Sequence, residues 1–198
     1  MDPLRILLLD VSHVTLETSV DMLEYPIGLV YIGTALKEAF GDRIELRIES
    51  YEHKRAGIEQ VEGILRDWRP DLLGMRALTM GRRPVHEIAR VARRRYGVPV
   101  IVAGGPHASD NPGEILADDA FDAAAVGEGE LTAVELVGRL LEDGGPGSKP
   151  GLEGIAGLAV RSNGGIEFTP RPLIEDLDSL PIPDHSLVDF LGINRGHV

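Results

Sequence analysis

The chain has 198 residues, of which 43% are hydrophobic and 26% are charged, and its formal net charge is −12. This composition predicts a folded globular protein, and the negative charge argues against binding to nucleic acid or to an anionic membrane. There is no cysteine. The chain therefore forms no disulfide and supplies no thiolate ligand to an iron–sulfur cluster or a zinc ion. No apolar run reaches the ~20 residues of a membrane span, and the N-terminal run is unlike a signal peptide. We therefore expect a cytoplasmic protein.

Apolar stretches of strand length alternate with segments of helical period over the first three quarters of the chain. We expect strands over residues 4–9, 44–48, 72–75, 98–103 and 123–126, and helices over residues 26–40, 58–68, 85–96, 112–116 and 131–141. This alternation predicts one α/β domain, residues 1–146, in which a five-stranded parallel sheet carries helices on both faces. Such a domain is flavodoxin-like or Rossmann-like.

A glycine-rich linker, residues 144–151, separates this domain from a C-terminal segment of different character. The turn sequence Ser-Asn-Gly-Gly at 162–165 lies between two apolar stretches and predicts a β-hairpin. Four prolines between residues 170 and 183 then favour an extended, acidic arm over a core element. We assign residues 147–198 to the linker, the hairpin and the arm.

Ligands of open parallel sheets bind at the carboxyl ends of the strands, so the loops there are the candidates for function. Residues 104–107 (Gly-Gly-Pro-His) allow close approach of the backbone to a ligand, although they also suit a plain turn. Residues 127–130 (Gly-Glu-Gly-Glu) are no dinucleotide fingerprint, because the two acids would repel a pyrophosphate. Their simpler role is to complement the dipole of the helix that follows. In the loop 76–83, Arg82 and Arg83 at a helix start predict a compensating anion or an acidic neighbour.

Taken together, these segments resemble the N-terminal cobalamin-binding domain of B12-dependent radical SAM enzymes. The matching segments, in chain order, are residues 26–32, 69–75, 79, 102–107, 122, 127–132, 135–136, 155–158 and 174–183. The resemblance implies a cobalamin on the carboxyl edge of the sheet, with its nucleotide tail between strands and helices. The cofactor-binding residues that it implies are Gly28, Arg76, Leu78, Thr79, Gly104, Gly105, His107, Gly127, Glu128, Gly129 and Glu130.

The sequence also departs from cobalamin proteins and from this family in two informative ways. The Asp-x-His-x-x-Gly motif of methylcobalamin and mutase proteins, which the family that this chain resembles generally lacks, is absent here too, so we expect no histidine ligand to cobalt from that motif and none from His13. We expect Arg76 near the lower corrin face. In family members a radical SAM barrel follows, with cysteines for a [4Fe–4S] cluster shortly after an Arg-Gly. Here Arg195-Gly196 is followed by His197, so we expect the cluster and S-adenosylmethionine only in a domain or partner outside this sequence.

The predicted function is a cobalamin-binding module that positions a corrinoid for methyl transfer or radical chemistry by a radical SAM domain or partner. We predict no catalytic residue, and the dispersed histidines indicate no metal site of the chain's own. Two alternatives stay open. One is a sensory or scaffolding protein that binds a partner through its acidic, proline-rich arm. The other is an FMN-binding flavodoxin-like protein, although residues 11–16 make a poor phosphate loop.

Overall fold

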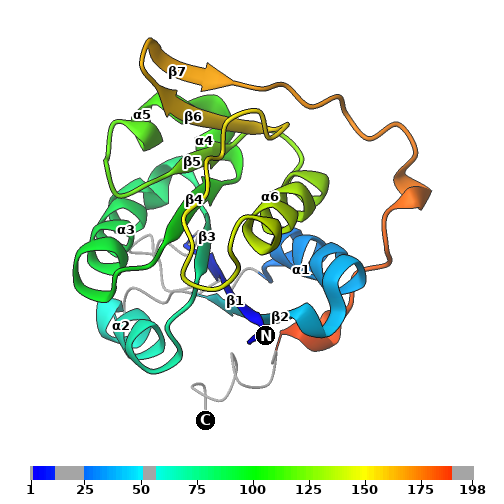
Figure 1. Ribbon diagram of the computed structural model, residues 1–198, viewed down its shortest axis with the longest axis horizontal. Coiled ribbons are helices and arrows are strands. Elements are labelled where there is room, and N and C mark those ends of the chain that lie inside the picture. Colours follow the sequence, from blue (N-terminus) through cyan, green and yellow to red (C-terminus); the bar gives the residue numbers. More distant parts are fainter. Residues whose placement is uncertain (1, 12–24, 51–56, 189–198) are drawn as a thin grey trace, which may run out of the picture.

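Seven strands form a single mixed sheet at the centre of the protein (Figure 1). The structure is a computed structural model that describes residues 2–11, 25–50 and 57–188. The strands lie in the order β2-β1-β3-β4-β5-β6-β7. Their bounds are β1 Leu4–Asp10, β2 Ile44–Ser50, β3 Leu72–Arg76, β4 Val100–Gly104, β5 Ala123–Ala125, β6 Leu158–Ser162 and β7 Gly165–Phe168.

Helices cover both faces of this sheet, as the alternating pattern predicts. Helices α1 and α6 lie on one face and α2, α3 and α5 on the other (Figure 1). The helices are α1 Ile27–Phe40, α2 Gly57–Trp68, α3 Arg82–Tyr96, α4 Pro106–Asp110, α5 Pro112–Leu116 and α6 Glu130–Glu142. Among the described residues, no helix is long and apolar enough to span a bilayer.

The number of strands differs from the predicted five. Strands β1 to β5 are parallel, as expected, but the hairpin β6–β7 adds two further strands, with β6 antiparallel to β5. The short strand β5 would otherwise leave an open sheet edge, which exposes unpaired backbone groups. Leu158 and Val160 of β6 are buried against that edge. The predicted boundary after residue 146 stays a prediction, and both strands of the segment beyond it belong to this sheet.

The exit of β4 leads directly into the short helix α4. Gly105 has a φ of 88°, and Pro106 directly after it opens helix α4 at the position where proline suits a helix start. A Cβ on Gly105 would lie 3.1 Å from the carbonyl oxygen of Ala77. This close approach and the left-handed φ require glycine at this position, and together they hold the ends of β3 and β4 side by side.

The C-terminal arm follows an extended path around the outside of α6 and α1 (Figure 1). Near its start, Arg171 donates to the carbonyl oxygen of Ala156 at 2.9 Å. Near its end, the amide of Asp184 donates to Oγ1 of Thr34 in α1 at 2.8 Å, and Val188 is buried in the core beneath that helix. The arm is therefore anchored to the domain at both ends of its described course.

Candidate functional site

An apolar cavity of about 280 Å³ lies between the sheet and the helices α1 and α6. It opens at the carboxyl edge of the parallel strands, where the sequence places the functional loops. Its lining comes from five strands, two helices and the loops at the strand ends: Leu8, Gly28, Leu29, Ile32, Leu36, Leu72, Gly74, Met75, Arg76, Val102, Gly104, Gly105, Ala125, Gly127, Glu128, Gly129, Glu130, Thr132, Ala133, Leu136 and Leu158.

The strand register explains how deep the cavity reaches. Leu72, Gly74 and Arg76 are alternate residues of β3, so they share one face of the sheet. Arg76 lies at the mouth and Leu72 four residues further in, which is ~13 Å at the usual rise along a strand. Gly74 pairs with Leu8 on one side and Val102 on the other. A Cβ on Gly74 would lie 2.9 Å from Cδ2 of Leu8, so the missing side chain lets Leu8 pack closely at this depth.

Glycines form most of the rim of the cavity. At Gly28 and Gly127 an added Cβ would meet no protein atom within 4 Å, so these backbone segments face open space. Gly127 also has a φ of 84°, which favours glycine. A Cβ on Gly129 would lie 2.8 Å from Cδ1 of Ile32, and its absence lets α6 begin against α1. The rim therefore presents bare backbone on which a flat ligand can rest.

Three of the four polar side chains of the lining, those of Arg76, Glu128 and Thr132, are held by neighbouring segments. Arg76 forms an ion pair with the buried Asp10 at 3.2 Å. The carboxylate of Glu128 accepts a hydrogen bond from the amide of Ile174 in the arm at 2.9 Å. Oγ1 of Thr132 donates to the carbonyl oxygen of Glu128 at 3.3 Å. The arm and the mouth of the cavity thus share direct contacts.

Eight of the eleven predicted site residues line this cavity, namely Gly28, Arg76, Gly104, Gly105, Gly127, Glu128, Gly129 and Glu130. The other three lie outside the lining. Leu78 precedes the short 3₁₀ turn Thr79–Gly81, to which Thr79 belongs. His107 in α4 is fully buried, and neither of its ring nitrogens has a hydrogen-bond partner. Its Nε2 lies 3.8 Å from a carboxylate oxygen of Glu114.

Sequence reasoning missed the apolar walls, which supply much of the cavity. Leu36 of α1, Leu136 of α6 and Leu158 of β6 read as ordinary core residues. A usable signal is the row Leu8, Gly74 and Val102, which parallel pairing places side by side with one glycine among large residues. His13 and residues 195–197, on which two expectations depended, lie outside the described residues.

A second hollow, on the opposite face of the sheet, is lined by acidic and basic side chains that form ion pairs with one another. It lies between α3 and α5. Nδ1 of His86 and Nε of Arg90 lie 2.9 and 2.8 Å from one carboxylate oxygen of Asp118. Arg82 pairs with Glu114 at 3.5 Å, which is the acidic neighbour predicted for that helix start. Burial by itself raises the pKa of Asp118, but hydrogen bonds from His86 and from the Ala120 amide, with the charge of Arg90, lower it overall.

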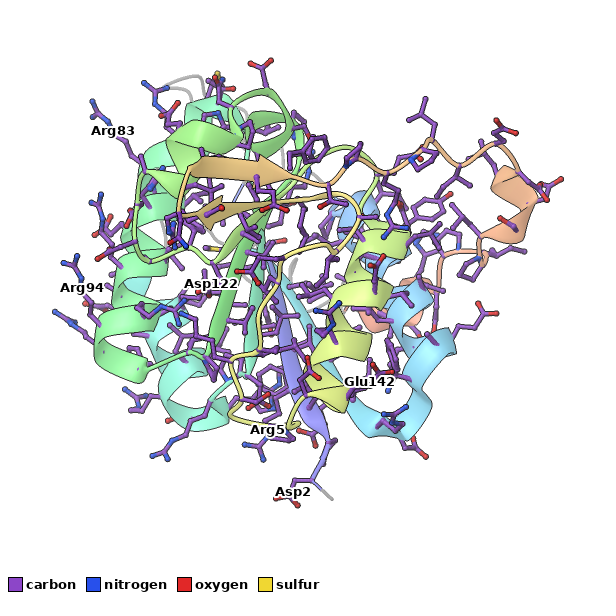
Figure 2. The ribbon with its side chains drawn as sticks, turned by 45° about the horizontal axis from the view of Figure 1, so that its top comes forward. Asp2, Arg5, Arg83, Arg94, Asp122 and Glu142 are labelled. Atoms are coloured by element: carbon purple, nitrogen blue, oxygen red, sulfur yellow. The ribbon has the colours of Figure 1, made fainter. Side chains whose placement is uncertain are left out.

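Of the other basic side chains of α3, Arg93 is partly buried and forms an ion pair with Asp122. Arg83 and Arg94 point away from the body of the protein in Figure 2. No group of three or more His, Asp or Glu side chains that could hold a metal ion occurs within residues 2–11, 25–50 and 57–188. The apolar cavity is therefore the best candidate for a ligand site in the described part of the chain.

Comparisons with known proteins point to one family. The family model of the B12 binding domain matches residues 14–137. Over 165 residues, 82% of this chain, the sequence is 30% identical to the uncharacterized methyltransferase PH0819 of Pyrococcus horikoshii. Over 123 residues, 62% of this chain, it is 32% identical to the cobalamin-dependent radical SAM methyltransferase TokK of Streptomyces tokunonensis.

A solved structure has the same fold. It is the radical S-adenosylmethionine methyltransferase TsrM of Kitasatospora setae with cobalamin and a [4Fe–4S] cluster bound. It superposes with a TM-score of 0.68 over 93% of this chain, at 19% sequence identity. The chain spans 34% of the P. horikoshii protein, 17% of TokK and 32% of the TsrM chain. Because the family model covers well over half of the sequence, the chain belongs to the B12-binding domain family.

Proposed function

We propose that this chain binds cobalamin and presents it to a radical SAM domain or subunit. The observation that carries the proposal is the apolar, glycine-rimmed cavity at the carboxyl edge of the sheet, in a chain of the B12-binding domain family. Glycine backbone suits the flat face of a corrin ring, and an apolar channel suits the base at the end of its nucleotide tail. The cofactor supplies the organometallic chemistry, whether methyl transfer or radical, and the protein supplies binding and orientation.

The size of the cavity implies that only the base of the nucleotide tail lies inside it and that the corrin ring lies outside. About 280 Å³ is close to the lower limit of small-molecule pockets, which is enough for a bicyclic base but far too small for a corrin ring. The ring therefore rests outside, across Gly104, Gly105 and residues 127–130. Arg76 at the mouth is the side chain that we place near its lower face. The tail enters between β3, β4 and the helices α1 and α6.

Other predicted residues take roles around the ring. The carboxylates of Glu128 and Glu130 at the rim suit the amide N–H groups that surround a corrin. Leu78 and Thr79 follow the end of β3, and we place them beside the glycines on which the ring rests. His107 is fully buried in α4, the helix that Gly105 positions, so we place it behind the glycines on which the ring rests, without direct contact. The contacts that we propose with the cofactor are those of Glu128, Glu130, Leu78 and Thr79, and no catalytic role is proposed for any of these residues.

The partner that we propose is a radical SAM domain, which would hold the [4Fe–4S] cluster and S-adenosylmethionine. Support comes from TokK and TsrM, which are radical SAM methyltransferases and much longer than this chain. The arm lies on the cavity side of the sheet, and its Leu173, Leu177 and Ile182 are exposed, as residues that pack against a further domain would be. The cytosol as its location remains a prediction from the sequence.

Equilibrium dialysis of the purified chain against hydroxocobalamin tests the proposal, with corrin absorbance as the readout. We expect one corrinoid retained per chain. Ala133→Leu, which fills the cavity from α6, should abolish retention. The matched control is Ala117→Leu, an exposed position on the opposite face, which should retain it. Absence of retention by the unaltered chain, or equal retention by both variants, would overturn the proposal.

A further inference from the structure

The inner half of the cavity is apolar on every side. Leu72 of β3, Val102 of β4, Leu36 of α1, Leu136 of α6 and Leu158 of β6 enclose it. All five belong to the core between the sheet and helices α1 and α6. A group that enters this space therefore exchanges water for aliphatic carbon.

Backbone polar groups do not alter this character. The strand amides and carbonyls around Gly74 and Val102 pair within the parallel sheet, and those of α1 and α6 are used within the helices beyond the first turn. An entering base consequently meets the side chains of the walls, while the peptide groups behind them are already bonded.

Of the four polar side chains of the lining, Arg76, Glu128 and Thr132 have partners, and Glu130 lies in the first turn of α6. Oγ1 of Thr132 donates to the carbonyl oxygen of Glu128 and accepts from Nε of Arg171 at 3.0 Å. Glu128 accepts from the amide of Ile174, and Arg76 pairs with Asp10. The five residues that enclose the inner half are all aliphatic, so their side chains offer no donor or acceptor to a group bound there.

We propose that this inner cavity selects the base at the end of the corrinoid's nucleotide tail, accepting a methyl-substituted benzimidazole and discriminating against a purine. The inference rests on the proposed function. Bound through its glycosidic nitrogen, dimethylbenzimidazole keeps one free ring nitrogen, and its two methyl groups gain from apolar burial. Adenine keeps three ring nitrogens and an amino group, each of which loses water on entry and finds no partner.

Three corrinoids separate this inference from the function on which it rests. The full chain is dialysed against cobalamin, against the cobamide that carries adenine as its lower base, and against cobinamide, which has no nucleotide tail. We expect the adenine cobamide to bind at least tenfold more weakly than cobalamin, a difference of about 1.4 kcal/mol. Equal affinity for the two tailed corrinoids would overturn the inference and leave the proposed function intact. Failure to bind any of the three would overturn both.

A pair of isosteric variants locates the selectivity. Val102→Thr places a hydroxyl on the cavity wall, whereas Val100→Thr places one on the same face of the same strand, outside the lining. Val102→Thr should reduce the preference for cobalamin over the adenine cobamide to about threefold or less. Val100→Thr should keep the preference of the unaltered chain. An unchanged preference in Val102→Thr, or the same change in both variants, would contradict the assignment of selectivity to this wall.

Discussion

The two faces of the sheet are built from the same strands but are packed differently. On one face, alternate residues such as Ile101 and Ala124 are fully buried against α2, α3 and α5. On the other face their neighbours Val102 and Ala125 border the cavity beneath α1 and α6. Close packing gives most core side chains contacts on all sides, whereas a cavity wall lacks them on one side. Both faces contain buried core residues, but the face beneath α1 and α6 is less completely packed because it borders the cavity.

The largest effect that we expect from this contrast is on stability. Ile101→Ala removes three carbons from the filled face and should lower the free energy of unfolding by about 3–4 kcal/mol. Val102→Ala removes two carbons that border empty space, and it should cost about 1 kcal/mol. Urea unfolding followed by circular dichroism measures both, with equal m-values as the check that unfolding stays two-state. Equal losses per carbon would mean that the two faces are packed alike.

Enlarging side chains instead of truncating them should have a smaller effect on stability. Ala124→Leu overfills the packed face and should cost about 1–3 kcal/mol, while Ala125→Leu has the cavity to enter and should change stability by less than about 0.5 kcal/mol. Ala125→Leu should nevertheless lose corrinoid retention in dialysis. If Ala125→Leu destabilised the protein as much as Ala124→Leu, the cavity would not accept a side chain from β5. Full retention by a stable Ala125→Leu would place the ligand elsewhere.

The alternating pattern was enough to predict the fold, because apolar runs buried on both sides and helices of one-sided period are local signals. The cavity required more. Gly74 reads as an unremarkable residue of a strand until parallel pairing sets it beside Leu8 and Val102. The rim was predictable because its glycines cluster at strand ends. The addition of β6 to the sheet was not, since the turn at 162–165 predicts a hairpin without saying which edge it joins.

The arm is a further difference between the faces, because it crosses only the cavity side. Arg171 donates to Ala156, Thr132 and Glu135, and its side chain is 17% exposed. Arg171→Met keeps much of the aliphatic stem but removes these bonds, and it should weaken attachment of the arm by about 1–2 kcal/mol. Hydrogen exchange should then accelerate at the amide of Ile174, with little change in β3 and β4. Uniform acceleration throughout the sheet would show that the arm is integral to the core.

The smallest effect concerns the ion pairs on the face opposite the cavity. There Asp118, which follows α5, interacts with His86 and Arg90 of α3. Its pKa is lowered from the ordinary 3.8 despite burial, because His86, the Ala120 amide and Arg90 favour the carboxylate. The folded pKa is thus below the unfolded one, so this stabilisation is complete above the unfolded value and is lost as the pH falls through the folded value.

Asp118→Asn removes that pH-dependent contribution. Arg90 is half exposed, so we expect a loss below about 1 kcal/mol at pH 7. Urea unfolding of both proteins between pH 7 and pH 3 should give a constant difference above pH ~5 and a shrinking one below pH ~4. Corrinoid retention should be unchanged, since Asp118 lies across the sheet from the cavity. A difference that grows as the pH falls would mean that Asp118 is more easily protonated in the folded state than in the unfolded chain. A parallel loss of retention would show that the two faces are energetically coupled.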